Sequence, residues 1–290
     1  VPMADDITVE ADSGGHTDNR PLVSLLPAII ALREQFQKQY SYSHFIRVGA
    51  AGGIGSPASA LAAFMMGAAY VVTGSVNQAC VEAAASEHSK GLLAQAEMAD
   101  VIMAPAADMF EMGVELQVLK RGTLFPMRAK KLYELYKNYE SIEDIPLLER
   151  QKLEQQVFRN SLEEIWSQTK EHFYARDPHQ IERAKDHPKR KMALIFRWYL
   201  GLTSHWSNIG EIGRETDYQI WAGPAIGAFN NWVKGSYLED VSQRKTVEVA
   251  WHIMTGAAYL YRLRHLQTQG IRLPFSCEAY FPKPFLTKPN

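Results

Sequence analysis

The sequence reads FIRVGAAGGIGSP over residues 45–57, where a short apolar run ends in glycines and is followed by a serine and a proline. The run Phe45–Ala50 is typical of a strand. Ser56 followed by Pro57 is typical of a helix start, and we predict that helix over Ala58–Met66. A strand, a glycine-rich loop and a helix in this order form one βα unit.

The same pattern occurs on both sides of this stretch. Before it, Asp6–Asp12 is predicted to be a strand that ends in the letters SGGH, and Leu22–Tyr40 to be an amphipathic helix. After it, Ala69–Thr73 is predicted to be a third strand, which ends at Gly74 and Ser75. Repeated βα units imply parallel strands joined by crossover helices, so the fold class is α/β.

The chain becomes mostly helical and more polar beyond residue 82. Helical spacing predicts helices over Met127–Tyr139, Pro146–Ala184, Lys189–Leu202 and Leu238–Gln269. The Gly-, Trp- and Asn-rich segment Trp206–Gly235 is predicted to be an ordered irregular loop. We therefore expect βα units over residues 1–82 and a large, mainly helical subdomain over residues 83–290, serving as a lid or as a docking surface.

Composition excludes several classes of protein. The 31 Lys and Arg residues balance 32 Asp and Glu residues, so the chain is no polycation for nucleic acid. Glycines interrupt the longest apolar stretch, Ala58–Val76, which argues against a membrane span. Cys80 and Cys277 lack the spacing of a disulfide framework or a zinc site, and no group of histidines has metal-ligand spacing. We expect a cytoplasmic protein without a metal.

The glycines at the strand ends predict an anion site. Without side chains, backbone N–H groups can close on a phosphate, and Gly52-Gly53 precedes a helix start whose N–H groups suit an anion. Gly74 and Ser75 add further donors and a hydroxyl. The alternative interpretation is that these glycines only close ordinary left-handed turns.

His16 follows two glycines at a strand end, so its imidazole is predicted to face the same edge of the sheet. Near neutral pH an imidazole can move a proton or donate a hydrogen bond to a carbonyl. Asp12, Asp18 and Asn19 flank it and could orient the ring or satisfy the loop backbone. The alternative is a structural turn histidine.

Three motifs resemble the last three strand-end motifs of the nitronate monooxygenase (2-nitropropane dioxygenase-like) and FMN enoyl-reductase superfamily: DSGGH at 12–16, GAAGGI at 49–54 and VTGS at 72–75. Longer strings resemble one branch of it, the PfaD-type trans-acting enoyl reductases of polyunsaturated-fatty-acid and polyketide synthases. These strings are ADSGGHTDNRP, APAADMFEMGVELQVLKRGTLFPMRAKKLYELY, KRKMALIFRWYLGL and DYQIWAGPAIGAFNNWVKGSYLED.

The resemblance implies strands six to eight of a TIM (β/α)8 barrel that binds FMN. It places His16 in the active site and Gly14 and Gly15 at the flavin. The residues that it implies for the FMN phosphate are Gly52, Gly53, Thr73, Gly74 and Ser75. It further implies NADPH as co-substrate and the C=C bond of an enoyl thioester on an acyl-carrier protein as the bond reduced.

The family's first five strands have no counterpart in this sequence. We expect the missing N-terminal barrel half to be supplied in cis or in trans, because three parallel strands cannot close a barrel and leave the edge Ile7–Ala11 unpaired. Residues 1–290 alone are therefore not expected to form a self-sufficient enzyme.

Two other functions stay open: flavin oxidation of the nitronate monooxygenase type, and a non-catalytic docking or structural subunit. Acyl-carrier proteins are acidic, so either of two basic clusters could dock one, although such clusters are also typical of a solvated helix face. The clusters are Lys120, Arg121, Arg128, Lys130 and Lys131, and Lys185, Lys189, Arg190 and Lys191. The aromatics Trp198, Trp206, Trp221 and Trp232 are predicted to pack in the core of the helical region. The sequence also leaves a homodimer open.

Overall fold

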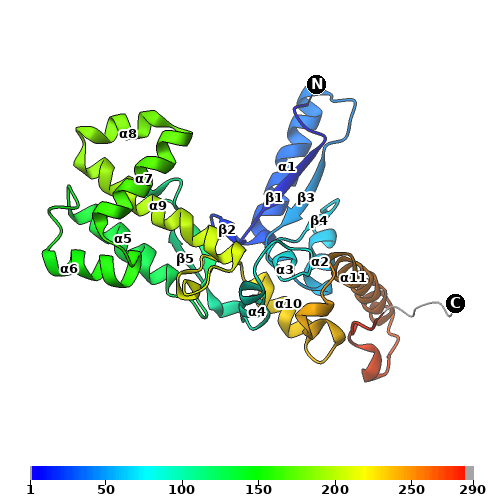
Figure 1. Cartoon of the computed structure of the whole chain (residues 1–290). Coiled ribbons are helices and arrows are strands. Elements are labelled where there is room, and N and C mark those ends of the chain that lie inside the picture. The colour runs from blue at the N-terminus through cyan, green and yellow to red at the C-terminus, as the bar shows by residue number, and fades with distance from the viewer. Residues whose placement is uncertain (1, 285–290) are drawn as a thin grey trace. The chain divides into compact units, whose positions relative to one another are not determined.

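In the computed structural model, which describes residues 2–284, three strands form a parallel sheet in chain order, as Figure 1 shows. They are β1 (Asp6–Glu10), β3 (Arg47–Ala51) and β4 (Val71–Val72). The crossover helices are α1 (Leu22–Tyr40) and α2 (Pro57–Met65). The predicted parallel βα repeat is confirmed, and α1 begins and ends at the predicted residues.

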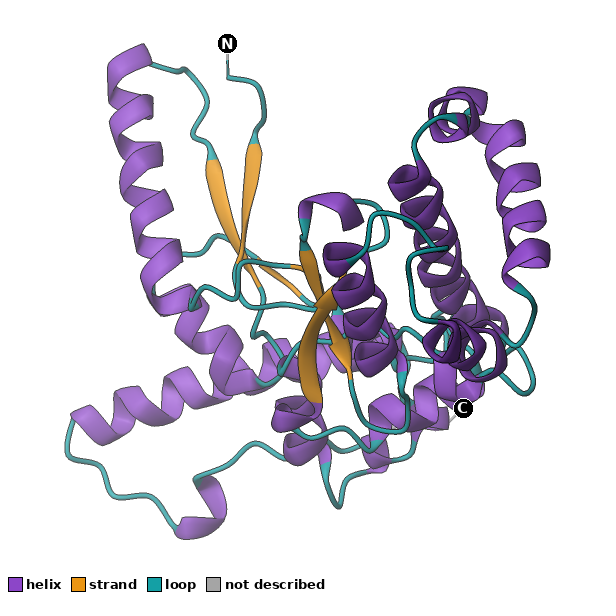
Figure 2. Ribbon diagram, turned by 90° about the vertical axis from the view of Figure 1, so that its left-hand side faces the viewer, coloured by secondary structure: helices purple, strands orange, loops and turns teal. Residues whose placement is uncertain are grey.

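The two faces of this sheet differ. Val9, Val48 and Ala50 are buried on the face that α1 packs against, and Val9 lies opposite Ala50 in the register. On the other face, Thr8 and Glu10 are exposed. Figure 2 shows the long helix α1 lying along one side of the strands. Both faces of an α/β sheet are normally covered by helices. In this sheet the face that carries Thr8 and Glu10 is uncovered.

The chain groups into two units with a boundary different from the one expected at residue 82. Val1–Val101 and Trp221–Asn290 form the first, here called the glycine-loop unit, and Ile102–Ile220 forms the second, the helical unit. The C-terminal helices return to the glycine-loop unit because α11 (Thr246–Thr268) packs on α2. That contact is close: a Cβ added at Gly256 would lie 2.5 Å from Cγ of Pro57.

The glycine-loop unit holds further short elements. They are β2 (Gly15–His16), α3 (Ser75–Gln78), α4 (Glu87–Ala94), α10 (Ala225–Val233) and the 3-10 turns at Met98–Asp100, Tyr237–Glu239, Val241–Gln243 and Phe275–Cys277. The Ser56 cap of α2 is confirmed: Ser56 Oγ accepts from the Ser59 N–H, and Pro57 occupies the first turn.

The helical unit surrounds one large apolar core. Its centre includes Phe110, Phe158 and Phe196, against which Trp198 and Trp206 pack. The elements are β5 (Val101–Pro105), β6 (Glu115–Leu119), α5 (Phe125–Asn138), α6 (Leu147–Lys152), a π-helix (Leu153–Phe158), α7 (Leu162–Arg176), α8 (Pro178–Lys185), α9 (Pro188–Ile209) and 3-10 turns at Phe110–Met112 and Glu215–Asp217.

Three secondary-structure predictions for the region beyond residue 82 were wrong. β5 and β6 are neighbouring strands in a region predicted to be mainly helical, and the last four residues of β6 are buried. The single helix Pro146–Ala184 is broken, because Arg159 has φ +56° and Pro178 disfavours helix at the residue before it. The segment Trp206–Gly235 is not all irregular: α9 runs to Ile209 and α10 lies within it.

Within residues 2–284, no helix is both long and apolar enough to cross a membrane.

Candidate functional site

The glycine-ended loops of the glycine-loop unit surround one cavity of about 390 Å³. Among the predicted site residues, Gly14, Gly52, Gly53, Gly74 and Ser75 line it. These residues come from the ends of β1, β3 and β4, which parallel pairing brings to one edge of the sheet. The sequence therefore predicted correctly that these loops meet.

Two of the glycines leave space that a side chain would fill. A Cβ added at Gly53 or at Gly74 would meet no atom within 4 Å. Gly53 also has φ +73°, which favours glycine, whereas Gly74 has an ordinary φ of −115°. Gly52 is required for a different reason, since its Cβ would lie 2.6 Å from the carbonyl carbon of Ala11.

The start of α2 offers fewer donors than the sequence suggested. The N–H groups of Gly55 and Ser56 both donate to Ser59 Oγ, at 3.1 and 3.0 Å, as part of the capping box. These two groups are therefore already used within the protein. The backbone of the Gly53 and Gly74 loops and the Ser75 hydroxyl remain as donors on the cavity wall.

Ser75 and Thr73 have different surroundings. Ser75 is 7% exposed, and its Oγ accepts a 2.9 Å hydrogen bond from the Gly223 N–H, which leaves its own hydroxyl proton available to a ligand. The Thr73 hydroxyl donates to Asn77 Oδ1 at 2.9 Å and does not line the cavity. A direct role of the Thr73 side chain is therefore less well supported than one of Ser75.

Gly15 and His16 also lie outside the lining of this cavity. His16 is half-buried, and its ring meets Trp221 edge-on, with centroids 5.7 Å apart and planes at 84°. The flanking loop is braced by Asn19, whose side-chain amide donates to Asp12 Oδ1 at 3.2 Å. Asp12 and Asn19 thus hold the loop that carries the histidine.

The cavity fits the phosphate of a flavin nucleotide. Its volume of about 390 Å³ exceeds the needs of a phosphate group, and its glycine walls let backbone donors approach an anion. Among the described residues its lining includes no Lys or Arg, so an anion would be held by backbone N–H groups and the Ser75 hydroxyl. The carboxylate of Glu10 lines the cavity as well and accepts a 2.8 Å hydrogen bond from Ser13 Oγ.

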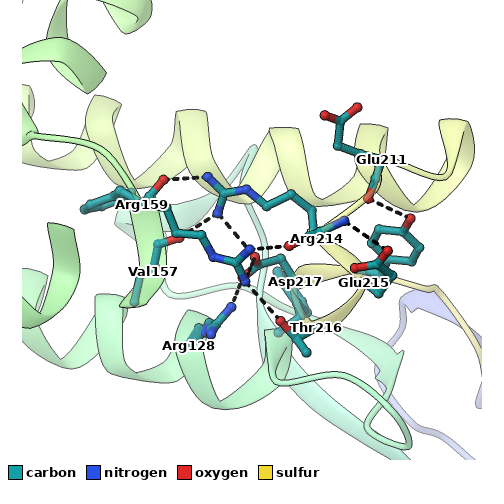
Figure 3. A network of polar contacts seen from close by, with 12 residues as sticks. Arg128, Val157, Arg159, Glu211, Arg214, Glu215, Thr216 and Asp217 are labelled. Carbon is teal, nitrogen blue, oxygen red and sulfur yellow. Dashed lines mark hydrogen bonds and ion pairs between the residues drawn. The ribbon is translucent and has the colours of Figure 1, made fainter. Parts of the chain in front are cut away.

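A second polar cluster lies in the helical unit around Asp217, as Figure 3 shows. Asp217 is fully buried and forms ion pairs with Arg128, Arg159 and Arg214. Tyr199 donates to Asp217 Oδ1 at 2.6 Å, and burial raises the pKa of Tyr199 to about 12, so that it stays a donor at neutral pH.

Two of these arginines, Arg214 and Arg159, also donate hydrogen bonds to backbone carbonyls. Arg214 donates to the carbonyl oxygens of Val157 and Phe158, at 2.9 and 2.6 Å, and Arg159 donates to that of Gly213. Burial lowers the pKa of Arg214, and the neighbouring Arg159 adds to this effect. Because these donors already have acceptors inside the unit, the cluster stabilises the helical unit and is not an anion site.

Acidic neighbours offset part of the charge in both predicted basic clusters. Lys189 pairs with Glu140 at 2.8 Å and Lys191 with Glu143 at 2.9 Å. In the other cluster Arg128 is committed to Asp217. Lys131 pairs with Glu149 at 3.0 Å. Lys120 and Arg121 are exposed in the loop after β6. Each cluster keeps an exposed basic side chain outside these ion pairs, Lys120 in the cluster at 120–131 and Lys185 in the cluster at 185–191.

Sequence reasoning missed two residues near the site. Trp221 was expected in the core of the helical region, but it belongs to the glycine-loop unit and is 39% exposed beside His16. Gln78 lines the cavity and donates from Nε2 to the Trp221 carbonyl oxygen at 2.6 Å. No local signal predicts this pairing, since the two residues are 143 positions apart.

Sequence comparison relates the chain to components of large synthases. The profile described as "[Acyl-carrier-protein] S-malonyltransferase, inserted helical domain" matches residues 139–218. A polyunsaturated fatty acid synthase subunit of Thraustochytrium sp. is 52% identical over 274 residues, which are 92% of this chain and 18% of that protein. Polyketide biosynthesis protein PksE of Bacillus subtilis is 51% identical over 264 residues, which are 91% of this chain and 34% of that protein.

Structural comparison gives a consistent result. The enoyl reductase domain of MlnA, from the macrolactin biosynthesis cluster of Bacillus amyloliquefaciens, superposes with a TM-score of 0.85 at 38% sequence identity. The match covers 92% of this chain and 59% of that domain's chain. The chain thus spans less than two thirds of each of these relatives.

Proposed function

We propose that this chain, which belongs to the PfaD-like enoyl-reductase family, provides the phosphate-binding part and the active-site histidine of an FMN-dependent enoyl reductase. The reductase would act in polyunsaturated-fatty-acid or polyketide synthesis. The observation that carries the proposal is the open cavity at the strand ends, where Gly53 and Gly74 leave room for a phosphate beside the Ser75 hydroxyl.

The chain's own residues would then divide the work. Backbone N–H groups of the Gly53 and Gly74 loops, with the hydroxyl of Ser75, would hold the FMN phosphate, and Gly14 would lie against the rest of the cofactor. When bound, FMN would supply hydride to the β-carbon of an enoyl thioester, with NADPH restoring its reduced form. His16 would donate a proton to the α-carbon or a hydrogen bond to the thioester carbonyl as negative charge develops there.

The sheet supports the proposal that this unit is part of a closed barrel. β1 pairs only with β3 among the described strands, so its other edge is open. Large apolar side chains are exposed along the elements next to that edge, including Ile7 on β1 and Val23 and Phe36 on α1. An open edge flanked by apolar side chains is suited to a further βα unit, and we propose that the remaining barrel strands pair there.

We further propose that the helical unit docks the acyl-carrier protein. An acidic carrier would be attracted by exposed basic side chains of the unit, such as Lys120 in the loop after β6 and Lys185 at the end of α8. The sequence profile that matches this unit describes a domain of an enzyme that acts on an acyl-carrier protein, which supports the assignment.

The direct test uses the purified full-length protein. We expect flavin absorption bands and NADPH oxidation that depends on a crotonyl thioester. Oxygen consumption with a nitroalkane, without thioester reduction, would instead favour nitronate monooxygenase chemistry. A protein that retains no flavin under any condition would contradict the proposal and favour a docking or structural subunit.

A further inference from the structure

We infer that Trp221 is the positioning and specificity-determining residue at His16, and that helix α3 holds it there. The inference rests on the proposed function, because it names a residue that would shape the same reaction. It is carried by two features: the contact of the indole with His16, and the way in which the loops of the site are built around the 221–223 segment.

The first feature is the indole itself. Its ring meets the imidazole edge-on at 5.7 Å, a geometry that aromatic pairs favour and that restricts the rotation of both rings. Trp221 keeps 39% of its surface exposed, so the indole still presents an apolar surface beside the histidine. A substrate whose carbonyl reaches His16 would place its acyl chain near this surface.

The GGH motif is shaped to admit the indole. Gly15 has φ +82°, and a Cβ there would lie 2.8 Å from Cε3 of Trp221. A Cβ at Gly14 would lie 2.8 Å from the backbone of Ala222. The two glycines therefore let the 221–223 segment lie directly on the loop that carries His16. This assigns Gly15 a role toward Trp221 in addition to the flavin contact that the family resemblance implies.

The second feature is a clamp formed by α3. Gln78 Nε2 donates to the Trp221 carbonyl oxygen at 2.6 Å, and Ser75 Oγ accepts from the Gly223 N–H at 2.9 Å. Both side chains also line the phosphate cavity. One short helix thus fixes the backbone on each side of Ala222 and joins the phosphate loop to the residue beside His16.

This arrangement gives Trp221 two effects. It keeps the His16 ring in the orientation from which a proton or hydrogen bond can be donated, and it contacts the acyl chain of the thioester. Loss of the first effect lowers the rate of thioester reduction, since a displacement of about 1 Å can cost roughly a hundredfold. Loss of the second raises KM more for long acyl chains than for crotonyl.

The test compares Trp221→Phe and Trp221→Ala in the full-length flavin-loaded protein. Trp251→Ala is the matched control, because Trp251 is 58% exposed on α11 of the same unit. We expect Trp221→Ala to slow flavin oxidation by the enoyl thioester roughly ten- to hundredfold. Its pH profile should change, and its loss in KM should grow with chain length. Trp221→Phe should recover most of the rate, and flavin reduction by NADPH should stay within about twofold in both variants.

A second measurement does not depend on flavin. The NMR signals of the His16 imidazole, recorded on protein with isotope-labelled histidines and assigned with His16→Ala, should shift in Trp221→Ala. They should stay unchanged in Trp251→Ala. Unchanged His16 signals would overturn the inference whatever the reaction proves to be. Equal losses in both half-reactions, without any dependence on pH or chain length, would overturn it as well and leave Trp221 a packing residue. A wild-type protein that carries no flavin would contradict the proposed function alone.

Discussion

The two units of this chain differ in how far their groups are satisfied by contacts inside the unit. The helical unit buries its aromatic side chains around one core and satisfies a buried carboxylate with three arginines. The glycine-loop unit leaves open space at its strand ends, beside Gly53 and Gly74. The comparison indicates that the polar groups of the Asp217 cluster are satisfied within the helical unit, whereas the strand-end loops of the glycine-loop unit leave open space.

The contrast between the two units would not hold if Gly74 were only a turn residue. Because its φ is ordinary and its Cβ direction is empty, Gly74→Val should fold normally but fill the phosphate cavity. We expect complete loss of flavin retention in the full-length protein, measured by absorption after gel filtration. Gly91→Val on α4 is the control, since a Cβ there also meets nothing within 4 Å. Normal flavin occupancy in Gly74→Val would rule out this cavity as the phosphate site.

A test at His16 shows whether the loops of the glycine-loop unit take part in the reaction. His16→Ala should retain flavin and lose roughly 10²–10⁴-fold in thioester reduction, the usual contribution of a positioned proton donor. Stopped-flow traces of the two half-reactions measure this, with flavin reduction by NADPH the less affected. His44→Ala, at an exposed histidine of the same unit, is the control. An unchanged oxidative half-reaction in His16→Ala would make His16 a structural turn residue.

The stability of the helical unit depends on Asp217. In Asp217→Asn the shape is kept but three guanidinium groups lose their shared counter-charge, so we expect a loss of about 3–5 kcal/mol in the stability of this unit. Urea unfolding followed by tryptophan fluorescence measures it. Asp186→Asn, at an exposed site of the same unit, should change the midpoint little. A matching small change in Asp217→Asn would mean that the arginines are satisfied by the backbone carbonyls alone.

A smaller effect is expected at the surface of the helical unit. Hydrogen bonds from Lys152 and Lys131 lower the pKa of Glu149 to about 2. The folded state therefore favours the carboxylate, and its contribution is present above the ordinary pKa and lost as pH falls toward about 2. Wild type should be slightly more stable than Glu149→Gln at pH 6, with the difference gone near pH 2. Because the lysines are exposed, salt should shrink it too. The control is Glu171→Gln, at an exposed glutamate in the middle of α7.

Much of the glycine-loop unit could be predicted because its signals are local. Alternating strand residues, the Ser56–Pro57 helix start and the glycines at strand ends act over a few residues, and the strands and loops were found where these patterns indicated. The meeting of Gly14, Gly52 and Gly74 at one cavity followed from the parallel order of the strands.

The rest depended on contacts that no local pattern encodes. β5 and β6 were missed because their short apolar runs lie among helical segments, where periodicity does not separate strand from buried helix. Trp221 was assigned to the wrong core because residues 83–290 were predicted to form one helical subdomain, whereas the chain from Trp221 onward belongs to the glycine-loop unit. Only the return of the chain to α3 decides its place.

That return has a consequence for how the protein is made. The bonds from Gln78 to Trp221 and from Ser75 to Gly223 join residues 143 and 148 positions apart, with the whole helical unit between them in the chain. On a ribosome adding about 5–20 residues per second, the first loops emerge roughly 7–30 seconds before their partners. During that interval the helical unit can close its own core, while the glycine loops remain without the segment that lies on them. Contacts of such long range are slow to form, so we expect the site to reach its final structure after the core of the helical unit.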